Sequence, residues 1–376
     1  MMKPRDYVAN IKPYVPGKPI QELERELGIG DCVKLASNEN PLGPSQMAVS
    51  AVREDLQTGG ELHRYPDGGG YYLKNALSEK LLSLGANISA DEITLGNGSN
   101  ELIDIAVRTF MGCGDEAVMA CPSFIVYAMS VQAVNGISVQ VPLNDYRHDL
   151  VAMADSITEK TKMVFIANPN NPTGTINKKD EFENFMNRVP PGVLVVVDEA
   201  YYEYVRDRSY PDTLTYLDGG KDILILRTFS KAYGLAGLRI GYGIARKEIL
   251  SELNRIRMPF NTTSLSQLAA MHALDDAGHL EKSVALNEEG KHFLYGELDA
   301  LGIAYVPTEA NFIYILLSCD SGSFYDSLLH KGVIVRPMGP KEVRVTIGLP
   351  EENRRFIEAL KTAICDRRKP TAHNLV

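Results

Sequence analysis

A lysine that could act as a nucleophile lies shortly after a strongly apolar segment. Residues Ile223–Leu226 are all aliphatic, and two of them are β-branched isoleucines, which predicts a strand buried on both faces of a parallel sheet; Lys231 follows in a loop. Ligands of such sheets bind beyond the carboxyl ends of the strands. The loop also contains Arg239 and several glycines, and an amine held near another cation in a partly desolvated pocket loses its proton more easily. The position therefore predicts a lysine suited to Schiff-base chemistry, although an isolated loop lysine is usually a solvated charge.

Two other predicted strands end on polar residues that could share this site. Residues 192–197 run into Asp198, and the apolar residues Met163–Ala167 precede the amide Asn171. Because the carboxyl ends of parallel strands meet at one edge of a sheet, we expect the amide, the carboxylate and the lysine to lie together. A buried carboxylate is costly without a partner, so Asp198 favours a cationic group there; the alternative is a helix N-cap.

A further candidate for a ligand-binding segment is a turn that could bind an anion. Residues 92–107 predict a strand that passes through Gly98, Ser99 and Asn100 into an amphipathic helix. Backbone N–H groups at the start of a helix suit a phosphate. Turns of this type also occur in α/β proteins without any ligand.

The pattern around these residues predicts an α/β fold. Predicted strands alternate with helices along the first two thirds of the chain, which is typical of a parallel sheet covered on both faces. The later strands and helices predict a second, smaller α/β domain. We expect an N-terminal arm over residues 1–45 that contributes to the small domain, a large domain over 46–260, and a small C-terminal domain over 261–376. The predicted strands are Ala117–Ala120, Ile137–Val141, Met163–Ala167, Ala310–Leu317, Gly332–Val335 and Val343–Ile347.

Composition limits the classes of partner. The 376 residues carry a net charge of −9, so the chain has no basic surplus with which to neutralise nucleic acid phosphates. The five cysteines show no metal-ligand spacing, which predicts free thiols and no metal site. No apolar segment approaches the ~20 residues of a membrane helix, and the first residues have no signal core. We therefore expect a cytoplasmic enzyme.

Three motifs together resemble those of the fold-type I pyridoxal phosphate aminotransferases, and the resemblance covers nearly the whole chain. They are the Asn-Asn-Pro-Thr-Gly loop at 170–174, Asp198-x-x-Tyr201, and Ser230-Lys231-x-x-Gly-Leu-Ala-Gly-Leu-Arg239. The segments 35–44, 64–67 and 343–348 resemble the histidinol-phosphate aminotransferase branch. This resemblance implies a large domain with a mostly parallel seven-stranded sheet between helices, a homodimer, and the cofactor pyridoxal 5'-phosphate. It implies amino transfer between L-histidinol phosphate and 2-oxoglutarate in histidine biosynthesis.

The resemblance also assigns roles around the cofactor. It implies that Lys231 binds the cofactor covalently and later moves a proton, and that Asp198 lies by the pyridine nitrogen and keeps it protonated. Asn171 and Tyr201 would bond the phenolic oxygen, and Phe124 would stack on the ring, although alone it would read as a core residue. The implied phosphate site consists of Gly98, Ser99, Asn100, Ser230, Arg239 and, from a neighbouring subunit, Tyr65.

For the substrate, the resemblance implies four residues. Arg344 would hold an anionic group in a forked geometry, and Arg336 and Tyr14 would select the phosphate, whereas each arginine alone would read as a solvated charge. Asn38 would contact the substrate or order the arginine. The same resemblance makes the Asn171–Pro172 and Cys121–Pro122 bonds candidates for cis peptides.

Three alternatives remain open from the sequence. An aromatic amino acid aminotransferase is the nearest, because a site for an imidazole ring can accept a phenyl ring. A phosphothreonine decarboxylase on the same scaffold is the second. The third is a cofactor-sensing regulator without catalysis, which would need an attached DNA-binding module that the acidic N-terminal half does not indicate.

Overall fold

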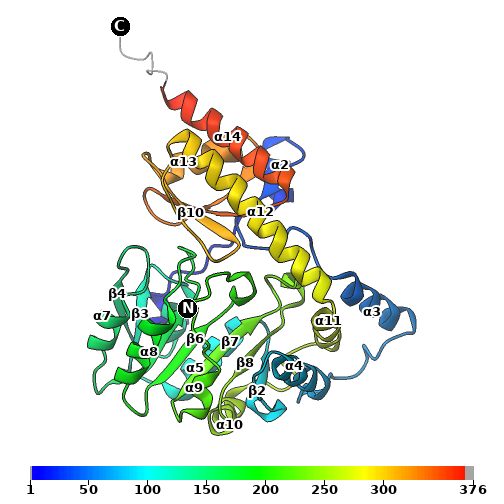
Figure 1. Ribbon diagram of the computed structural model, residues 1–376, viewed down its shortest axis with the longest axis vertical. Helices are drawn as coiled ribbons and strands as arrows, with labels where there is room; N and C mark the ends of the chain where they lie inside the picture. Colours follow the sequence, from blue (N-terminus) through cyan, green and yellow to red (C-terminus); the bar gives the residue numbers. More distant parts are fainter. Residues whose placement is uncertain (1, 369–376) are drawn as a thin grey trace.

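A seven-stranded sheet forms the centre of the larger part of the molecule (Figure 1). The computed structural model describes residues 2–368. The strand order is β2-β8-β7-β6-β5-β3-β4, and β8 alone runs antiparallel to its neighbours β2 and β7. The prediction of an α/β fold with a mostly parallel seven-stranded sheet is therefore confirmed. The strands are β2 Ile93–Gly96, β3 Glu116–Cys121, β4 Ile137–Pro142, β5 Thr161–Ala167, β6 Leu194–Asp198, β7 Ile223–Thr228 and β8 Gly241–Ile244.

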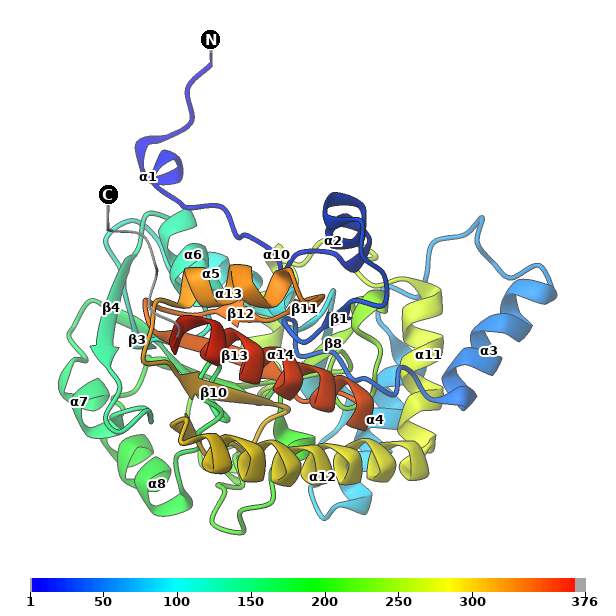
Figure 2. The same cartoon turned by 90° about the horizontal axis from the view of Figure 1, so that it is seen from above.

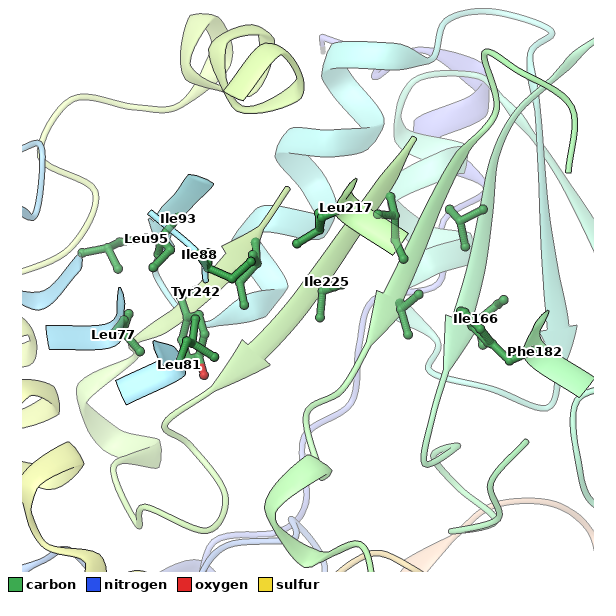
Figure 3. Close-up of a cluster of buried hydrophobic side chains, with 14 of the residues drawn as sticks. Leu77, Leu81, Ile88, Ile93, Leu95, Ile166, Phe182, Leu217, Ile225 and Tyr242 are labelled. Carbon is green, nitrogen blue, oxygen red and sulfur yellow. The ribbon is translucent and has the colours of Figure 1, made fainter. Parts of the chain in front are cut away.

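Helices cover both faces of this sheet, because its central strands are apolar on both sides. On one face Ile225 of β7 belongs to a cluster with Leu77 and Leu81 of α4 and Phe182 of α8 (Figure 3). On the other face the core is made with α5, α6 and α10. The helices of this part are α3 Gln46–Gln57, α4 Tyr71–Ser83, α5 Ser99–Phe110, α6 Val126–Ala133, α7 Leu150–Asp155, α8 Lys179–Arg188, α9 Thr215–Asp218, α10 Lys247–Ile256 and α11 Ser264–Asp275, with short 3-10 turns at Ala90–Glu92, Tyr202–Tyr204 (η2) and Ala236–Leu238.

The smaller part has an antiparallel sheet in the order β12-β13-β10-β9 with helices on one side. Seen from above, α14 lies between α12 and α13 (Figure 2). The N-terminal segment joins this part, because β1 pairs in parallel with β11. The elements of this part are β1 Val33–Lys34, β9 Tyr305–Val306, β10 Phe312–Leu316, β11 Val333–Ile334, β12 Arg336–Pro337, β13 Glu342–Thr346, α2 Ile20–Leu27, α12 Ala277–Leu301, α13 Ser321–Leu329 and α14 Pro350–Arg368. The short helix α1 Asp6–Ala9, near the start of the chain, packs instead against α6 of the larger part.

The helix α12 connects the two parts and was not predicted from the sequence. Val284 near its start packs with Tyr201 of the large part, whereas Leu294 and Leu298 pack in the core of the small part. A helix that buries different faces along its length shows no single apolar stripe, so its periodicity is weak. Because α11 packs in the core of the large part, we propose a domain boundary within α12 rather than near residue 260. Residues 369–376 of the predicted C-terminal domain lie outside the described part of the chain.

Two cis peptide bonds occur, at Cys121–Pro122 and Asn168–Pro169. The first was predicted. The prediction of a cis bond at Asn171–Pro172 was wrong: the cis proline is the earlier of the two in this loop, directly after the end of β5. A motif with two Asn-Pro pairs does not by itself indicate which pair turns the chain.

Residues 2–368 can be searched for membrane helices, metal sites and free cysteines. Within that range no helix is long and apolar enough to cross a membrane. No group of three or more histidine, cysteine, aspartate or glutamate side chains in the same range could hold a metal ion. Cys32, Cys113, Cys121 and Cys319 are free thiols.

Candidate active site

One cavity of about 240 Å³ lies at the carboxyl ends of β5, β6 and β7, between the two parts of the molecule. It brings together residues from the N-terminal arm, the large part and the small part. Of the fifteen residues predicted for the site, two do not line the cavity, Gly98 and Tyr65. Those that line it are Tyr14, Asn38, Ser99, Asn100, Phe124, Asn171, Asp198, Tyr201, Ser230, Lys231, Arg239, Arg336 and Arg344.

Lys231 reaches the cavity from the loop after β7. Its Nζ donates to the backbone oxygen of Ser37 at 3.3 Å and lies 5.7 Å from the centre of the Tyr201 ring. Burial, and then the nearby positive charge of Arg344, lower the pKa of this amine to about 8. A lysine with such a pKa is partly neutral near physiological pH and can act as a nucleophile or a base.

Asp198 ends β6 and is buried, with 7% of its surface exposed. Its Oδ2 accepts a hydrogen bond from the Tyr127 hydroxyl at 2.7 Å, and its Oδ1 accepts one from the Ala200 backbone N–H at 3.1 Å. Burial raises the pKa of the carboxyl group, whereas these hydrogen bonds lower it. The carboxylate is thus held in place but lacks a cation directly bonded to it, so the position suits a cationic ligand group.

Tyr201 presents its hydroxyl group to the cavity. The oxygen accepts a hydrogen bond from Asn38 Nδ2 at 2.9 Å, which leaves its own hydrogen free to donate. Burial raises the pKa of the phenol, so it stays protonated. Asn38 is held in turn by Thr346, whose hydroxyl accepts from its backbone N–H at 2.9 Å. Asn38 therefore orders the Tyr201 side chain, and it also lines the cavity, where a substrate contact stays a prediction.

Arg344 enters the site from β13 and is buried, with 8% of its surface exposed. It donates to Asn171 Oδ1 at 2.6 Å and to the Ala36 backbone oxygen at 2.7 Å. Both acceptors are uncharged, and the buried Nε has no hydrogen-bond partner. Burial lowers the pKa of this guanidinium, which means that its charge is poorly compensated. An anionic ligand would supply the missing partner.

The groups predicted to form an anion cradle lie together at the start of α5. Gly98 precedes the helix with φ +73°, a conformation that favours glycine, and a Cβ there would lie 2.5 Å from an Arg239 side-chain nitrogen. Arg239 also donates to the Ser230 hydroxyl at 3.2 Å. The backbone amides of α5, one hydroxyl and one guanidinium thus converge on one end of the cavity, as a phosphate group requires.

The N-terminal arm crosses the cavity near Arg336 of β12. Arg336 donates to the Val15 backbone oxygen at 2.7 Å, and its guanidinium lies 5.3 Å from the centre of the Tyr14 ring. Farther back in the arm, the Tyr7 backbone oxygen accepts from Gln132 of α6, beside which α1 lies (Figure 2). The arm therefore joins both parts of the molecule across the site.

Tyr65 lies outside the cavity. It is 80% exposed, and its ring stacks on that of Phe260 at 4.6 Å between centroids. Leu62 and Met258, each 62% exposed, belong to the same two segments of chain. Two exposed apolar segments side by side mark a surface suited to protein contact.

Tyr127 also lines the cavity and was not predicted as a site residue. Tyr127 lies three residues after Phe124, but Phe124 precedes the helix that begins at Val126, so the spacing alone did not indicate that the two rings meet. Ser37, Ser123, Thr228 and Met338 likewise line the cavity, but small and apolar residues of this kind carry no sequence signal for a site.

Sequence comparison with known proteins identifies the family. The profile of the aminotransferase class I and II family matches residues 30–360. The chain is 49% identical to histidinol-phosphate aminotransferase of Moorella thermoacetica over 96% of this chain and 92% of that protein. It is 46% identical to histidinol-phosphate aminotransferase 1 of Idiomarina loihiensis over 94% of this chain and 95% of that protein.

Solved structures of aminotransferases have the same fold as this chain. The crystal structure of histidinol-phosphate aminotransferase from Sinorhizobium meliloti in complex with pyridoxal 5'-phosphate superposes with a TM-score of 0.88. It is 26% identical and covers 98% of this chain and 99% of that chain. An aspartate aminotransferase of Thermus thermophilus, 22% identical, shares the fold with a TM-score of 0.82 over 96% of this chain and 100% of that chain. This chain belongs to the aminotransferase class I and II family, within its histidinol-phosphate aminotransferase branch.

Proposed function

We propose that this protein transfers the amino group between L-histidinol phosphate and 2-oxoglutarate with pyridoxal 5'-phosphate as cofactor, in histidine biosynthesis. The observation that carries the proposal is that Lys231, Asp198 and Arg344 line a single cavity with the start of α5. The relatives named histidinol-phosphate aminotransferase, identical to this chain at 44–49%, support the choice of substrate.

The residues of the cavity fit the cofactor part by part. The amides of α5 with Ser230 and Arg239 suit its phosphate, and Asp198 suits its ring nitrogen. Tyr201 has a hydrogen free to donate to its phenolic oxygen. Phe124 offers a ring for stacking.

When bound, pyridoxal phosphate supplies an electrophilic carbonyl carbon and a ring that accepts electrons from the carbon bearing the substrate amine. The chain supplies the proton transfer: Lys231 Nζ, with a pKa of about 8, can accept a proton from that carbon and would pass it to the carbon of the cofactor that gains the amine. Asp198 offers a negative charge that favours a protonated ring nitrogen, which strengthens the electron-accepting character of the ring.

Recognition of the substrate rests on the cations at the opposite end of the cavity. Arg344 has an unpartnered buried Nε and suits the carboxylate of 2-oxoglutarate or the anionic group of the amino donor. Arg336 and Tyr14 meet at the arm and suit the phosphate of histidinol phosphate.

Replacement of Lys231 by alanine tests the chemistry. The variant should lose the lysine-dependent absorbance at the short-wavelength end of the visible range and the transferase activity, because no other lysine among the described residues lines the cavity. Lys160→Ala, at an exposed position, is the matched control and should keep both. A band of unchanged position and intensity in Lys231→Ala would contradict the assignment.

The choice of substrate is tested by kinetics. We expect kcat/KM for histidinol phosphate to exceed that for phenylalanine, and Arg336→Gln to reduce the former much more than the latter, because only the former carries a phosphate. Equal values for both substrates would favour an aromatic amino acid aminotransferase. Release of carbon dioxide from phosphothreonine would favour the decarboxylase.

We also propose a homodimer in which Tyr65 reaches the phosphate site of the neighbouring subunit. The support is its position outside the cavity of its own chain, on an exposed aromatic surface with Phe260. A cytoplasmic location is proposed as well, since free thiols persist in reducing compartments.

A further inference from the structure

Tyr127 is a buried side chain with two contacts toward the cavity. It lies on α6 and is 1% exposed. Its ring stacks on Phe165 of β5 at 4.7 Å and meets Phe124 edge to face at 5.6 Å between centroids. The ring is therefore fixed by the core on one side and supports Phe124 on the other.

The hydroxyl group of Tyr127 points to Asp198. It donates to Oδ2 at 2.7 Å, and burial together with the negative charge of Asp198 keeps the pKa of the phenol well above its usual value. The group therefore stays a donor over the working range of pH. Because Oδ1 accepts from the Ala200 N–H, the carboxylate is held at both oxygens and cannot rotate freely.

We propose that Tyr127 is a positioning residue that sets both the charge and the orientation of Asp198 and the plane of Phe124. The inference rests on the proposed function, in which Asp198 meets the ring nitrogen of the cofactor and Phe124 its face. A single side chain would then align two of the groups that hold the cofactor ring, on neighbouring elements of the fold.

Removal of the hydroxyl group has a defined electrostatic consequence. The titratable and charged groups around Asp198 are Tyr127 from α6, Lys231 after β7, and Glu199 and Tyr201 from its own turn. The hydrogen bond from Tyr127 opposes the effect of burial on the carboxyl pKa, so its loss raises that pKa further. In the variant, Asp198 then becomes neutral at a higher pH than in the wild type. The affinity of the protein for a cofactor ring with a protonated nitrogen therefore falls more at acidic pH than at alkaline pH.

The test uses Tyr127→Phe, which keeps the ring and removes the hydroxyl group, and Tyr127→Leu, which removes both. Tyr216→Phe is the matched control, since its ring packs edge to face on Phe182 and neither residue lines the cavity. The apoproteins are titrated with pyridoxal phosphate at about pH 6 and about pH 8.5, and Kd is read from quenching of tyrosine fluorescence. The melting temperature of each apoprotein and the absorbance spectrum of each complex are measured in parallel.

We expect Tyr127→Phe to raise Kd about ten-fold at the lower pH and clearly less at the higher one, as for a lost hydrogen bond to a charged group. Its apoprotein should melt close to the wild type, whereas Tyr127→Leu should melt lower and bind weakly at both values of pH. A Tyr127→Phe Kd equal to that of Tyr216→Phe at both values overturns the inference. Failure of the wild-type protein itself to bind pyridoxal phosphate would instead overturn the proposed function.

Discussion

Lys231 is a residue whose chemistry depends on its surroundings. On a solvated loop its amine would stay protonated at neutral pH, but burial and Arg344 lower its pKa to about 8. The folded protein thus holds a poorly solvated amine that its unfolded chain does not. The same lowering of the pKa that makes the amine reactive must reduce the stability of the apoprotein.

This leads to a prediction for Lys231→Met in the apoprotein. Because the folded pKa lies below the unfolded value of 10.5, the unfolded chain binds more protons between about pH 8 and 10.5, and the cost of the lysine is fully present below pH 8. The variant should be more stable than the wild type by about 2 kcal/mol at neutral pH, less than the full shift implies because the side chain is only partly buried.

The measurement is urea unfolding of both apoproteins across this range. The difference should shrink as pH rises from 8 toward 10.5, whereas Lys160→Met should show no such trend. A stability difference between wild type and Lys231→Met that is independent of pH would refute the explanation.

At the scale of elements, a buried ion pair joins the ends of β6 and β7, from which Asp198 and Lys231 reach the cavity. Glu199 and Arg227 are 0% and 3% exposed, and Glu199 Oε2 accepts from Arg227 Nε at 2.8 Å. The other carboxylate oxygen accepts from the Thr213 hydroxyl at 2.7 Å. Removal of one partner would leave a buried charge unpaired beneath the site.

Glu199→Ala should therefore reduce the free energy of unfolding by about 3–5 kcal/mol. Glu252→Ala is the control, because Glu252 pairs with Arg255 at the surface, where both side chains are well exposed, and should change it by less than about 1 kcal/mol. Equilibrium denaturation of the wild type and both variants measures these free energies of unfolding. Equal losses of free energy in the two variants would contradict a larger contribution from the buried pair.

Two glycines of the loop after β7 allow a second prediction at this scale. Gly234 has φ +70°, and a Cβ there would lie 2.1 Å from the Gly43 backbone oxygen, whereas a Cβ at Gly237 would meet nothing within 4 Å. Gly234→Ala must displace the segment that carries Lys231 or the one that carries Gly43, since backbone cannot move aside cheaply.

We expect Gly234→Ala to lose at least ten-fold in kcat/KM and to bind pyridoxal phosphate more weakly, with Gly237→Ala near the wild type. Steady-state kinetics and cofactor titration check both variants. A fully active Gly234→Ala would show that this close approach does not constrain the site.

At the scale of the whole molecule, the site lies between the two parts and is covered by the N-terminal arm. The exposed surface around Tyr65 and Phe260 lies outside it. A symmetric dimer that buries this surface would bring Tyr65 of each subunit to the other subunit's phosphate site, as proposed above.

Mixed dimers test this arrangement. Lys231→Ala lacks the amine, and Tyr65→Ala lacks the tyrosine, so each should be inactive or weak alone. In a hybrid, the subunit with an intact Lys231 receives Tyr65 from the Lys231→Ala subunit, and random mixing should restore about a quarter of the wild-type activity.

The hybrids are prepared by unfolding and refolding the mixture, with the separately refolded variants as controls and light scattering to confirm the dimer. Activity of the mixture no greater than the sum of the separate variants would exclude a shared site.

The sequence by itself determined the chemistry and much of the architecture. Lys231, Asp198 and Asn171 each follow an apolar segment, and in a parallel sheet such positions converge whatever the details of packing. The glycine before α5 likewise marks an anion cradle locally. The sequence motifs sufficed for these residues because short-range order and one rule of sheet geometry place them.

Only the tertiary structure decided how the remaining residues meet. The contacts of Arg344 with Asn171 and of Asn38 with Tyr201 join positions 173 and 163 residues apart. The support of Asp198 by Tyr127, the crossing of the arm over Arg336 and the course of α12 through both parts depend on packing as well. No local periodicity encodes such contacts, because their free energy arises from surfaces that come together only when the chain is folded.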